Sequence, residues 1–282
     1  MGTAAKASES VAATTWRRSG AASSSRAVAV ETAVAITYGG STQAVLMASP
    51  ADLEDFAIGF TLTEGIATLA AIESVERIDG GLGIEMRVSL ASQLSERLAA
   101  RRRAMAGPVG CGLCGIESLE EAVRPLPFNG SKARFAPEAI LAAIGGLARL
   151  QALNAETRAV HAAAFWQPDE GVRLVREDVG RHNALDKLAG AIARSGLDAA
   201  SGAVLLTSRV SVEMVQKTAA IGAPLIVAVS APTSLAIRAA AEAGITLVAV
   251  ARADGFEVFT HGERLGLPPS VPSRREATRD VA

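Results

Sequence analysis

The stretch Pro224-Leu225-Ile226-Val227-Ala228-Val229 is a continuous apolar run, and the polar cluster Ser230-Ala-Pro-Thr-Ser234 follows it directly. An apolar run without alternation is what a strand needs when both faces of its sheet are covered. Comparable runs at residues 203–207 and 245–250 alternate with helical patterns. This alternation predicts an α/β domain in which helices cover both faces of the sheet.

Working outward from this stretch, the patterns divide the chain into two folded domains. Turn signals such as Gly39-Gly40 and Gly80-Gly81 separate short β-rich runs ahead of residue 106, which predicts a smaller α+β domain. The Ala/Ser/Thr-rich start and the Pro/Ser/Arg-rich end lack periodicity and are expected to be disordered. The predicted organisation is a tail over residues 1–25, an α+β domain over 26–106, a glycine-rich loop region over 107–135, an α/β domain over 136–266 and a tail over 267–282.

The patterns also predict individual elements. Expected strands cover residues 28–38, 43–47, 74–78, 84–90, 162–166, 172–175, 203–207, 225–229, 245–250 and 257–260. Expected helices begin near residue 50 and end at Gly65, cover 92–103, run from Pro137 to about 153, and cover 183–194, 211–221 and 233–243.

Composition limits the classes of function. A hydrophobic fraction of 49%, a charged fraction of 20% and a net charge of −1 are typical of a soluble globular protein. A near-zero net charge argues against a general attraction to nucleic acid or to a membrane, and no apolar run is long enough to span one. Two cysteines do not make a secretory disulfide framework, and the region after Arg17-Arg18 lacks an apolar signal core. We therefore expect a cytoplasmic protein.

Polar clusters follow the predicted strands of the second domain, each ahead of a helix. The carboxyl ends of parallel strands form the ligand crevice of open α/β sheets, and helix N-termini there offer N–H groups to anions. Arginine side chains at this edge suit phosphate oxygens, which predicts a phosphate-bearing ligand. The alternative is that the Ser and Thr residues only cap helices and that the charges are solvated. The candidate ligand-binding residues are Arg181, His182, Ser208, Arg209, Ser230 and Arg252.

Two side-chain pairs have helical i,i+4 spacing. His182 and Asp186 would share one helix face, where the carboxylate would orient the imidazole or form a buried structural pair. Glu213 and Lys217 have the same spacing, and we expect an exposed pair on the helix surface.

The motif Cys111-Gly-Leu-Cys114 lies within the glycine-rich segment 107–115. Zinc needs four ligands and this chain offers two thiolates, so only a site shared across a dimer would hold the metal. A dithiol–disulfide oxidoreductase is an alternative, although no strand directly precedes the motif as in thioredoxin-like units. A third interpretation is a sulfur carrier, in which one thiolate accepts sulfur and the second thiol expels it. We expect no metal held by the protein itself.

Several long motifs together resemble the formate dehydrogenase accessory sulfurtransferases, the FdhD family. The similarity covers residues 26–261 in sequence order. Its motifs are Asp52-Leu-Glu-Asp-Phe-Ala-Ile-Gly-Phe60, Cys111-Gly-Leu-Cys-Gly115, Arg176-Glu-Asp-Val-Gly-Arg-His-Asn-Ala-Leu-Asp-Lys187, Thr207-Ser-Arg-Val-Ser-Val-Glu-Met-Val-Gln-Lys217 and Val229-Ser-Ala-Pro-Thr-Ser-Leu-Ala236.

The resemblance implies a cytidine-deaminase-like, three-layer C-terminal domain without the deaminase zinc signature. It implies a persulfide on Cys111, assistance from Cys114, a cysteine desulfurase as sulfur donor, and a homodimer. The acceptor would be the bis(molybdopterin guanine dinucleotide) molybdenum cofactor of formate dehydrogenase. A non-catalytic chaperone that only binds this cofactor is the remaining alternative.

The resemblance also places cofactor contacts on residues 250–255. These are Val250, Ala251, Arg252, Ala253, Asp254 and Gly255. The family pattern begins with an aromatic residue, followed two positions later by Arg-Gly. This chain keeps Arg252 but has Val250 and Ala253 instead, so a ring-stacking contact at position 250 is not expected.

Overall fold

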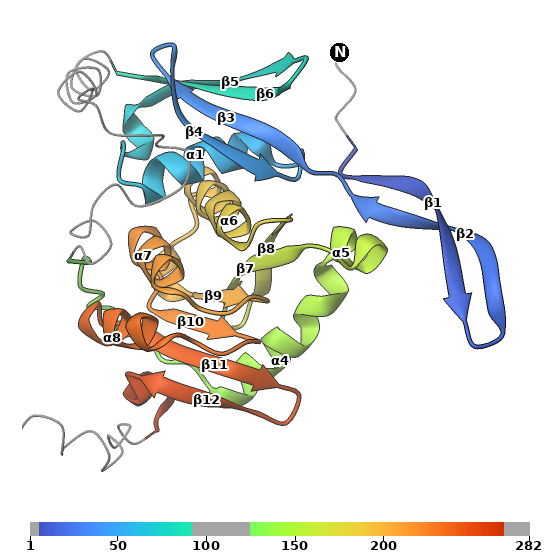
Figure 1. The fold of residues 1–282 in the computed structure, drawn as a ribbon. Coiled ribbons are helices and arrows are strands. Elements are labelled where there is room, and N and C mark those ends of the chain that lie inside the picture. Colours follow the sequence, from blue (N-terminus) through green and yellow to red (C-terminus); the bar gives the residue numbers. More distant parts are fainter. Residues whose placement is uncertain (1–5, 92–124, 268–282) are drawn as a thin grey trace, which may run out of the picture.

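A computed structural model describes residues 6–91 and 125–267 of the chain. The predicted helix over 92–103, the segment with both cysteines and the C-terminal tail from residue 268 lie outside the described residues. The described part contains a six-stranded sheet, a four-stranded sheet and a separate two-stranded ribbon (Figure 1).

The six-stranded sheet forms the centre of the larger domain. Its strand order is β12-β11-β10-β9-β7-β8. β9, β10 and β11 are mutually parallel, and β7 is antiparallel to both β9 and β8, so β8 points the same way as the three central strands. The strands are β7 (His161–Gln167), β8 (Gly171–Asp178), β9 (Ala203–Leu206), β10 (Leu225–Ala228), β11 (Thr246–Arg252) and β12 (Gly255–Thr260).

Helices cover both faces of this sheet. One face packs on three helices through Leu185, Met214 and Ala240, while the other packs on one helix through Ile140 and Leu147. The predicted α/β class and the helix–sheet–helix layers are confirmed, and the likeness to cytidine deaminase stays a prediction. The helices are α6 (Arg181–Ser195), α7 (Val212–Ile221) and α8 (Ser234–Glu242) on the first face and α4 (Pro137–Leu147) on the second.

The smaller domain is a four-stranded sheet with one helix on one face. Its strand order is β4-β3-β6-β5, and the core between sheet and helix contains Ile36, Phe56 and Val88. The predicted α+β character of this region is confirmed for its described residues. Its elements are β3 (Thr32–Tyr38), β4 (Ser41–Ala48), α1 (Leu53–Thr63), β5 (Ile72–Gly80) and β6 (Gly83–Leu90).

The two domains meet where α1 lies across α6 (Figure 1). The buried Asp55 carboxylate accepts hydrogen bonds from Arg176 Nη2 at 2.6 Å and from Arg194 Nη1 at 2.7 Å. Lys187 Nζ lies 2.6 Å from Asp178 Oδ2 and donates to the carbonyl oxygen of Ser49 at 2.9 Å. A buried charge needs such partners, so these contacts favour one docking arrangement of the domains.

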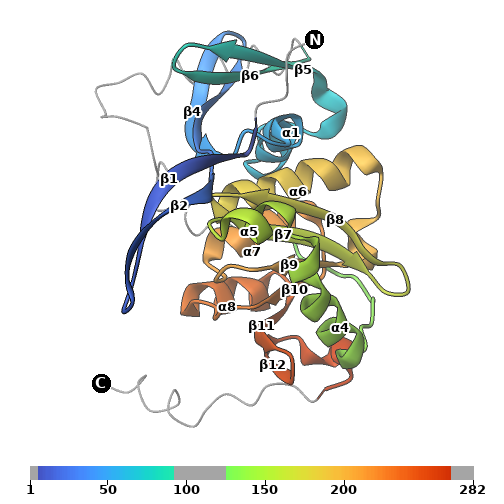
Figure 2. The same cartoon turned by 90° about the vertical axis from the view of Figure 1, so that its right-hand side faces the viewer.

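Most of the expected N-terminal tail is an ordered hairpin, so the prediction of disorder over residues 1–25 was wrong for residues 8–25, while residues 1–5 lie outside the described residues. β1 (Ser8–Arg17) pairs antiparallel with β2 (Gly20–Ala29), and β2 continues across the predicted domain boundary at residue 26. The ribbon projects away from both domains and contacts α5 (Ala152–Thr157) at its base (Figure 2). Small Ala, Ser and Thr residues fit a pleated ribbon as well as a disordered tail, so composition did not distinguish the two.

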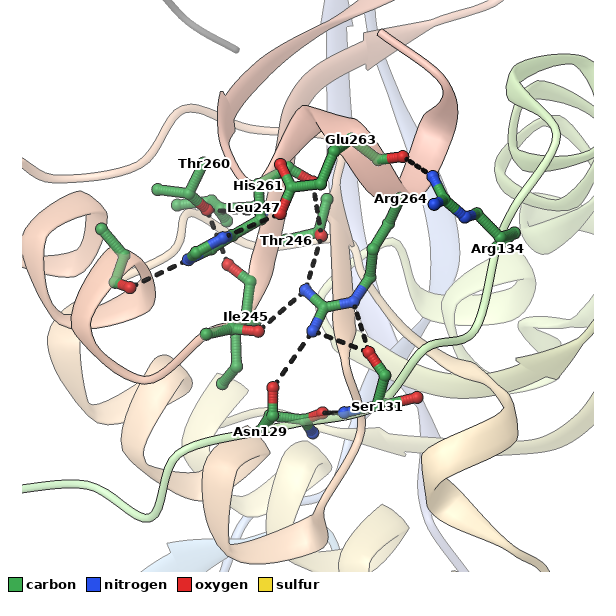
Figure 3. Close-up of polar contacts among 12 residues, drawn as sticks. Asn129, Ser131, Arg134, Ile245, Thr246, Leu247, Thr260, His261, Glu263 and Arg264 are labelled. Carbon is green, nitrogen blue, oxygen red and sulfur yellow. Dashed lines mark hydrogen bonds and ion pairs between the residues drawn. The ribbon is translucent and has the colours of Figure 1, made fainter. Parts of the chain in front are cut away.

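Residues 125–135, predicted as part of the loop region, pack on the larger domain instead. Phe135 is buried against the α4 side of the sheet. The buried Arg264 guanidinium donates to the carbonyl oxygens of Asn129 and Ser131 at 3.1 Å each, and to that of Gly244 at 2.8 Å (Figure 3). Arg264 thus ties this returning segment to the start of β11.

One smaller difference concerns a helix. The helix expected to run from Pro137 to 153 ends at Leu147, and a 3₁₀ turn and α5 follow, because Gln151 takes a non-helical conformation.

Among the described residues, no helix is long and apolar enough to cross a membrane.

Candidate functional site

The polar clusters of the larger domain meet at one edge of its sheet. β8, β9, β10 and β11 point the same way, so the segments that follow them leave from the same edge. His161 begins the antiparallel β7 and therefore lies at this edge too. The predicted gathering of these clusters at the carboxyl ends of the strands is confirmed.

Neighbouring loops at this edge are joined through their backbones. The amide of Val210 donates to the carbonyl oxygen of Ala231 at 3.3 Å, and the amide of Val250 donates to that of Ser230 at 3.2 Å. Val250 has a φ of 54°, which is unusual for a β-branched residue, and the β11–β12 pairing shifts register beside it. The edge is therefore a connected surface in which β11 ends with a bulge.

His182 and Glu213 face each other across the start of two helices. Both Arg181 and His182 lie in the first turn of α6, and Glu213 lies in the first turn of α7. His182 Nε2 is 3.9 Å from Glu213 Oε2, and each side chain is about one third exposed. Burial lowers the pKa of His182 to about 4, and the positive charge of Arg181 adds to this effect while Glu213 opposes it. The imidazole is therefore neutral at pH 7.

Two buried polar atoms near these helix starts, Arg181 Nε and His182 Nε2, have no hydrogen-bond partner among the described residues. The Ser211 side chain does not cap α7; although burial alone would raise the pKa of Glu213, a hydrogen bond from Ser211 lowers it. Thr233, by contrast, caps α8 by accepting a hydrogen bond from the amide of Ala236 at 3.3 Å. Buried polar groups are almost always paired in native proteins, so these unpaired groups mark a place where water or a ligand group completes the bonding. The capping interpretation therefore applies to Thr233 and not to Ser211.

The two i,i+4 pairs expected from the sequence do not form. Asp186 accepts hydrogen bonds from Thr63 Oγ1 at 2.6 Å and from Lys217 Nζ at 2.8 Å, instead of orienting His182. Lys217 is buried, and its ammonium group also lies 2.6 Å from Glu64 Oε1. Although burial disfavours its charge, the carboxylates of Asp186 and Glu64 raise the pKa of Lys217.

The prediction of the two i,i+4 pairs was wrong because it considered only residues within one helix. Thr63 and Glu64, which pair with Asp186 and Lys217, lie at the end of α1 in the smaller domain. The sequence offered no signal for this contact beyond the two long motifs that contain Asp186 and Lys217.

The remaining candidate residues lie on the same edge with different roles. Arg252 is exposed, and its guanidinium donates to the carbonyl oxygens of Val229 and Ala251. The side chain of Arg209 is exposed, while Ser208 is buried and its hydroxyl donates to the carbonyl oxygen of Arg209 at 3.0 Å. Ala253 and Asp254 form the exposed turn between β11 and β12. Gly255 is the first residue of β12.

Cys111 and Cys114 lie outside the described residues, so their position relative to this edge is not part of the structure. Within residues 6–91 and 125–267, no group of three or more His, Cys, Asp or Glu side chains is arranged to hold a metal ion.

A family model described as FdhD/NarQ matches residues 29–266 of the chain. The chain belongs to the FdhD/NarQ family. Among similar proteins, the sulfur carrier protein FdhD of Agrobacterium fabrum is 55% identical over 257 residues, which cover 90% of this chain and 95% of that protein. The sulfur carrier protein FdhD of Cupriavidus necator is 53% identical over 252 residues, which cover 89% and 87% of the two chains.

The FdhD/NarQ assignment agrees with a solved structure. A candidate formate dehydrogenase accessory protein from Desulfotalea psychrophila superimposes with a TM-score of 0.74 at 26% identity, covering 92% of this chain and all of that one. The family resemblance expected from the sequence motifs is therefore confirmed.

Proposed function

We propose that this FdhD/NarQ chain is a cytoplasmic sulfur carrier that takes sulfur onto Cys111 and transfers it to a molybdenum cofactor destined for formate dehydrogenase. The observation that carries the proposal is the 55% identity, over nearly the whole chain, to a protein named as a sulfur carrier. The pair Cys111 and Cys114 supplies the thiol chemistry that such a carrier needs.

The proposed loading step is a thiol exchange. The Cys111 thiolate attacks the terminal sulfur of a persulfide on a cysteine desulfurase, the donor's S–S bond breaks, and the donor cysteine leaves as a thiolate. Cys111 then carries the persulfide, and no net oxidation has taken place.

The proposed release step uses the second cysteine. The Cys114 thiolate attacks the inner sulfur of the Cys111 persulfide, so that a Cys111–Cys114 disulfide forms and the terminal sulfur leaves at the oxidation level of sulfide. That sulfide is the group passed to the cofactor. A cellular dithiol must then reduce the disulfide with two electrons before the next cycle.

The proposed acceptor is the bis(molybdopterin guanine dinucleotide) molybdenum cofactor, bound as a substrate at the polar edge of the six-stranded sheet. The exposed arginines at this edge, Arg209 and Arg252, suit its phosphates, and residues 250–255 would contribute further contacts. Arg181 Nε and His182 Nε2, which have no hydrogen-bond partner within the described part of the chain, support a ligand at the same edge. Formate dehydrogenase as the client and a homodimeric state belong to the same proposal.

A mass measurement tests the carrier role. After incubation with a cysteine desulfurase and cysteine, the peptide that contains Cys111 should gain about 32 Da, the mass of one sulfur atom. Cys111→Ala should abolish the gain, whereas Cys114→Ala should keep it and fail to release sulfur. A Cys111→Ser/Cys114→Ser variant that still activated formate dehydrogenase would exclude the proposal and favour a chaperone that only binds the cofactor.

A further inference from the structure

The N-terminal hairpin is an arm whose direction is fixed at its base. Only Val30 and Glu31 separate β2 from β3, and the amide of Val30 donates to the carbonyl oxygen of Ala7 at 2.8 Å. Ser8 Oγ donates to Glu156 Oε1 of α5 at 2.9 Å. The arm points away from both domains (Figure 2), so it cannot fold back onto the sheet of its own smaller domain.

One face of the arm has the composition of an interface. Strand residues alternate between faces, and the charged residues Glu9, Arg17 and Arg26 all lie on the face opposite to Trp16. The Arg26 side chain points towards α5, where Nη2 donates to the carbonyl oxygen of Thr157 at 3.5 Å. Interface cores are poor in charged residues and rich in aromatic ones. The Trp16 face consists of Ser10, Ala12, Thr14, Trp16, Ala21, Ser23, Ser25 and Ala27.

The Trp16 face needs a surface to pack on. Trp16 lies near the hairpin turn and is 75% exposed. A two-stranded ribbon alone is at best marginally stable in water, and it becomes stable when a further surface covers it. Because the arm points away from its own chain, that surface belongs to another molecule.

The open face of the four-stranded sheet offers a matching surface. The residues of β3 and β4 that face α1 lie in the core of the smaller domain, so alternation places their neighbours on the opposite face. There Ala33 is paired with Met47, and Ala35 is paired with Val45. Met47 is 50% exposed and Val45 is 37% exposed. These four residues form an uncharged apolar strip, named the β3–β4 strip below.

We propose that the hairpin is a dimerisation arm whose Trp16 face packs on the β3–β4 strip of a second copy of this chain. Both surfaces are present on every chain but cannot meet within one chain. A two-fold pairing of two copies covers both surfaces on each of them. The inference rests on the homodimeric state named in the proposed function and assigns the surfaces that form it.

The arm is large enough to hold two copies together. Each strand has 10 residues. At about 3.4 Å per residue and about 4.8 Å per strand, one face of the ribbon covers about 300 Å². Two arms and the two strips beneath them would bury about 1,200 Å² in total, which is the lower end of the range for specific interfaces. We therefore expect a dimer that dissociates on dilution.

Sedimentation of the full chain at a series of concentrations tests the inference. The unaltered protein should change from single chains to dimers as its concentration rises through the micromolar range. Trp16→Ser should raise the dissociation constant of the dimer about thirtyfold, because a buried tryptophan is a typical interface anchor. Met47→Glu should weaken the dimer at least as much, because it places an unpaired carboxylate in the contact.

Leu82→Ser is the matched control. Leu82 is 99% exposed in the turn between β5 and β6, and it belongs to neither surface. This variant also loses a large exposed apolar side chain, but it should keep the dissociation constant of the unaltered protein. Thermal unfolding of all three variants would verify that each remains folded.

The fluorescence of Trp16 tests where the arm docks. In Trp166→Phe, Trp16 is the only tryptophan left, so the emission should be red-shifted in dilute protein and should shift to the blue as dimers form. Adding Met47→Glu should abolish the blue shift. Met47 lies near the base of the arm in its own chain and Trp16 near the tip, so only a contact between copies connects the two residues.

The remaining outcomes would overturn the inference. Single chains at every concentration would also remove the homodimeric state from the proposed function. A dimer whose dissociation constant stays unchanged in Trp16→Ser and Met47→Glu would keep that state and reject the arm. Protection of Trp16 only after addition of a cysteine desulfurase or of formate dehydrogenase would assign the arm to that protein instead. Sulfur loading on Cys111 is a separate measurement, and its failure would reject the carrier role without bearing on the arm.

Discussion

Gly59 of α1 and Gly190 of α6 bring the backbones of the two helices into direct contact. A Cβ atom on Gly59 would lie 1.7 Å from the carbonyl oxygen of Asp186, and one on Gly190 would lie 2.0 Å from that of Asp55. Side chains thus cannot fit between the helices at this crossing. Because α6 also begins with Arg181 and His182, the same helix carries the domain interface and part of the candidate ligand edge.

Replacing either glycine should therefore destabilise the protein. We expect Gly59→Ala and Gly190→Ala each to lower the free energy of unfolding by about 3 kcal/mol, because backbone must move to admit the methyl group. Gly145→Ala is the control, since Gly145 lies in α4 and a Cβ atom added there would have no atom of the described residues within 4 Å. That control should be stabilised by about 0.5–1 kcal/mol, and urea unfolding would measure all three.

Removing the buried charge of Lys217 should lower the free energy of unfolding more than removing an exposed charge does. Lys217→Met leaves the buried Asp186 carboxylate without its ammonium partner, with an expected cost of about 3–5 kcal/mol. Adding Asp186→Leu should recover part of that loss, since no unpaired buried charge remains. Arg77→Ala, which breaks the more exposed pair with Asp79, should cost less than about 1 kcal/mol. Additive effects of Lys217→Met and Asp186→Leu in denaturant unfolding would contradict the pairing.

The neutral state of His182 has a pH signature. Its pKa of about 4 lies below the ordinary value of 6.5, so the unfolded state binds more protons between these values. Stability should therefore fall as pH drops from about 6.5 towards 4. Between about pH 7 and pH 5, the free energy of unfolding should fall less in His182→Gln than in the unaltered protein. The two losses should differ by about 1 kcal/mol, a value that allows for solvent screening of the partly exposed ring.

A direct measurement of the same group is an NMR titration of the histidine rings. The ring assigned to His182 should remain neutral at about pH 5, well below the ordinary histidine pKa. A titration midpoint near the ordinary value would show that the imidazole is solvated rather than buried beside Arg181.

The hairpin can be tested through the two tryptophans of the chain. Trp16 lies near the hairpin turn with 75% of its surface exposed, whereas Trp166 is buried with 4% exposed. In Trp166→Phe, the remaining fluorescence should be red-shifted and readily quenched by acrylamide. In Trp16→Phe it should be blue-shifted and protected. Protection of Trp16 would show that another surface covers the hairpin, which would stabilise it, because an isolated two-stranded ribbon is at best marginally stable in water.

The sequence by itself determined the α/β class, the order of the strands along the chain in the larger domain and the family. Continuous apolar runs such as Leu225–Ala228 can be buried on both faces only in a sheet covered on both sides, so they indicated the layers directly. The polar clusters after these strands predicted the ligand edge, because strands that point the same way end at the same side. The spacing of apolar and polar residues along a short segment predicts these features, because it sets which faces of a single strand or helix are buried.

Only the tertiary structure decided which side chains of different segments meet. Asp186 binds Lys217 of α7 and Thr63 of the smaller domain rather than His182, because α1 docks closely on α6 at Gly59 and Gly190. His182 faces Glu213 because the starts of α6 and α7 lie next to each other. The same holds for the N-terminal hairpin, whose small residues fit a ribbon or a disordered tail equally well. Contacts between segments far apart in the chain depend on helix docking, which local spacing does not encode.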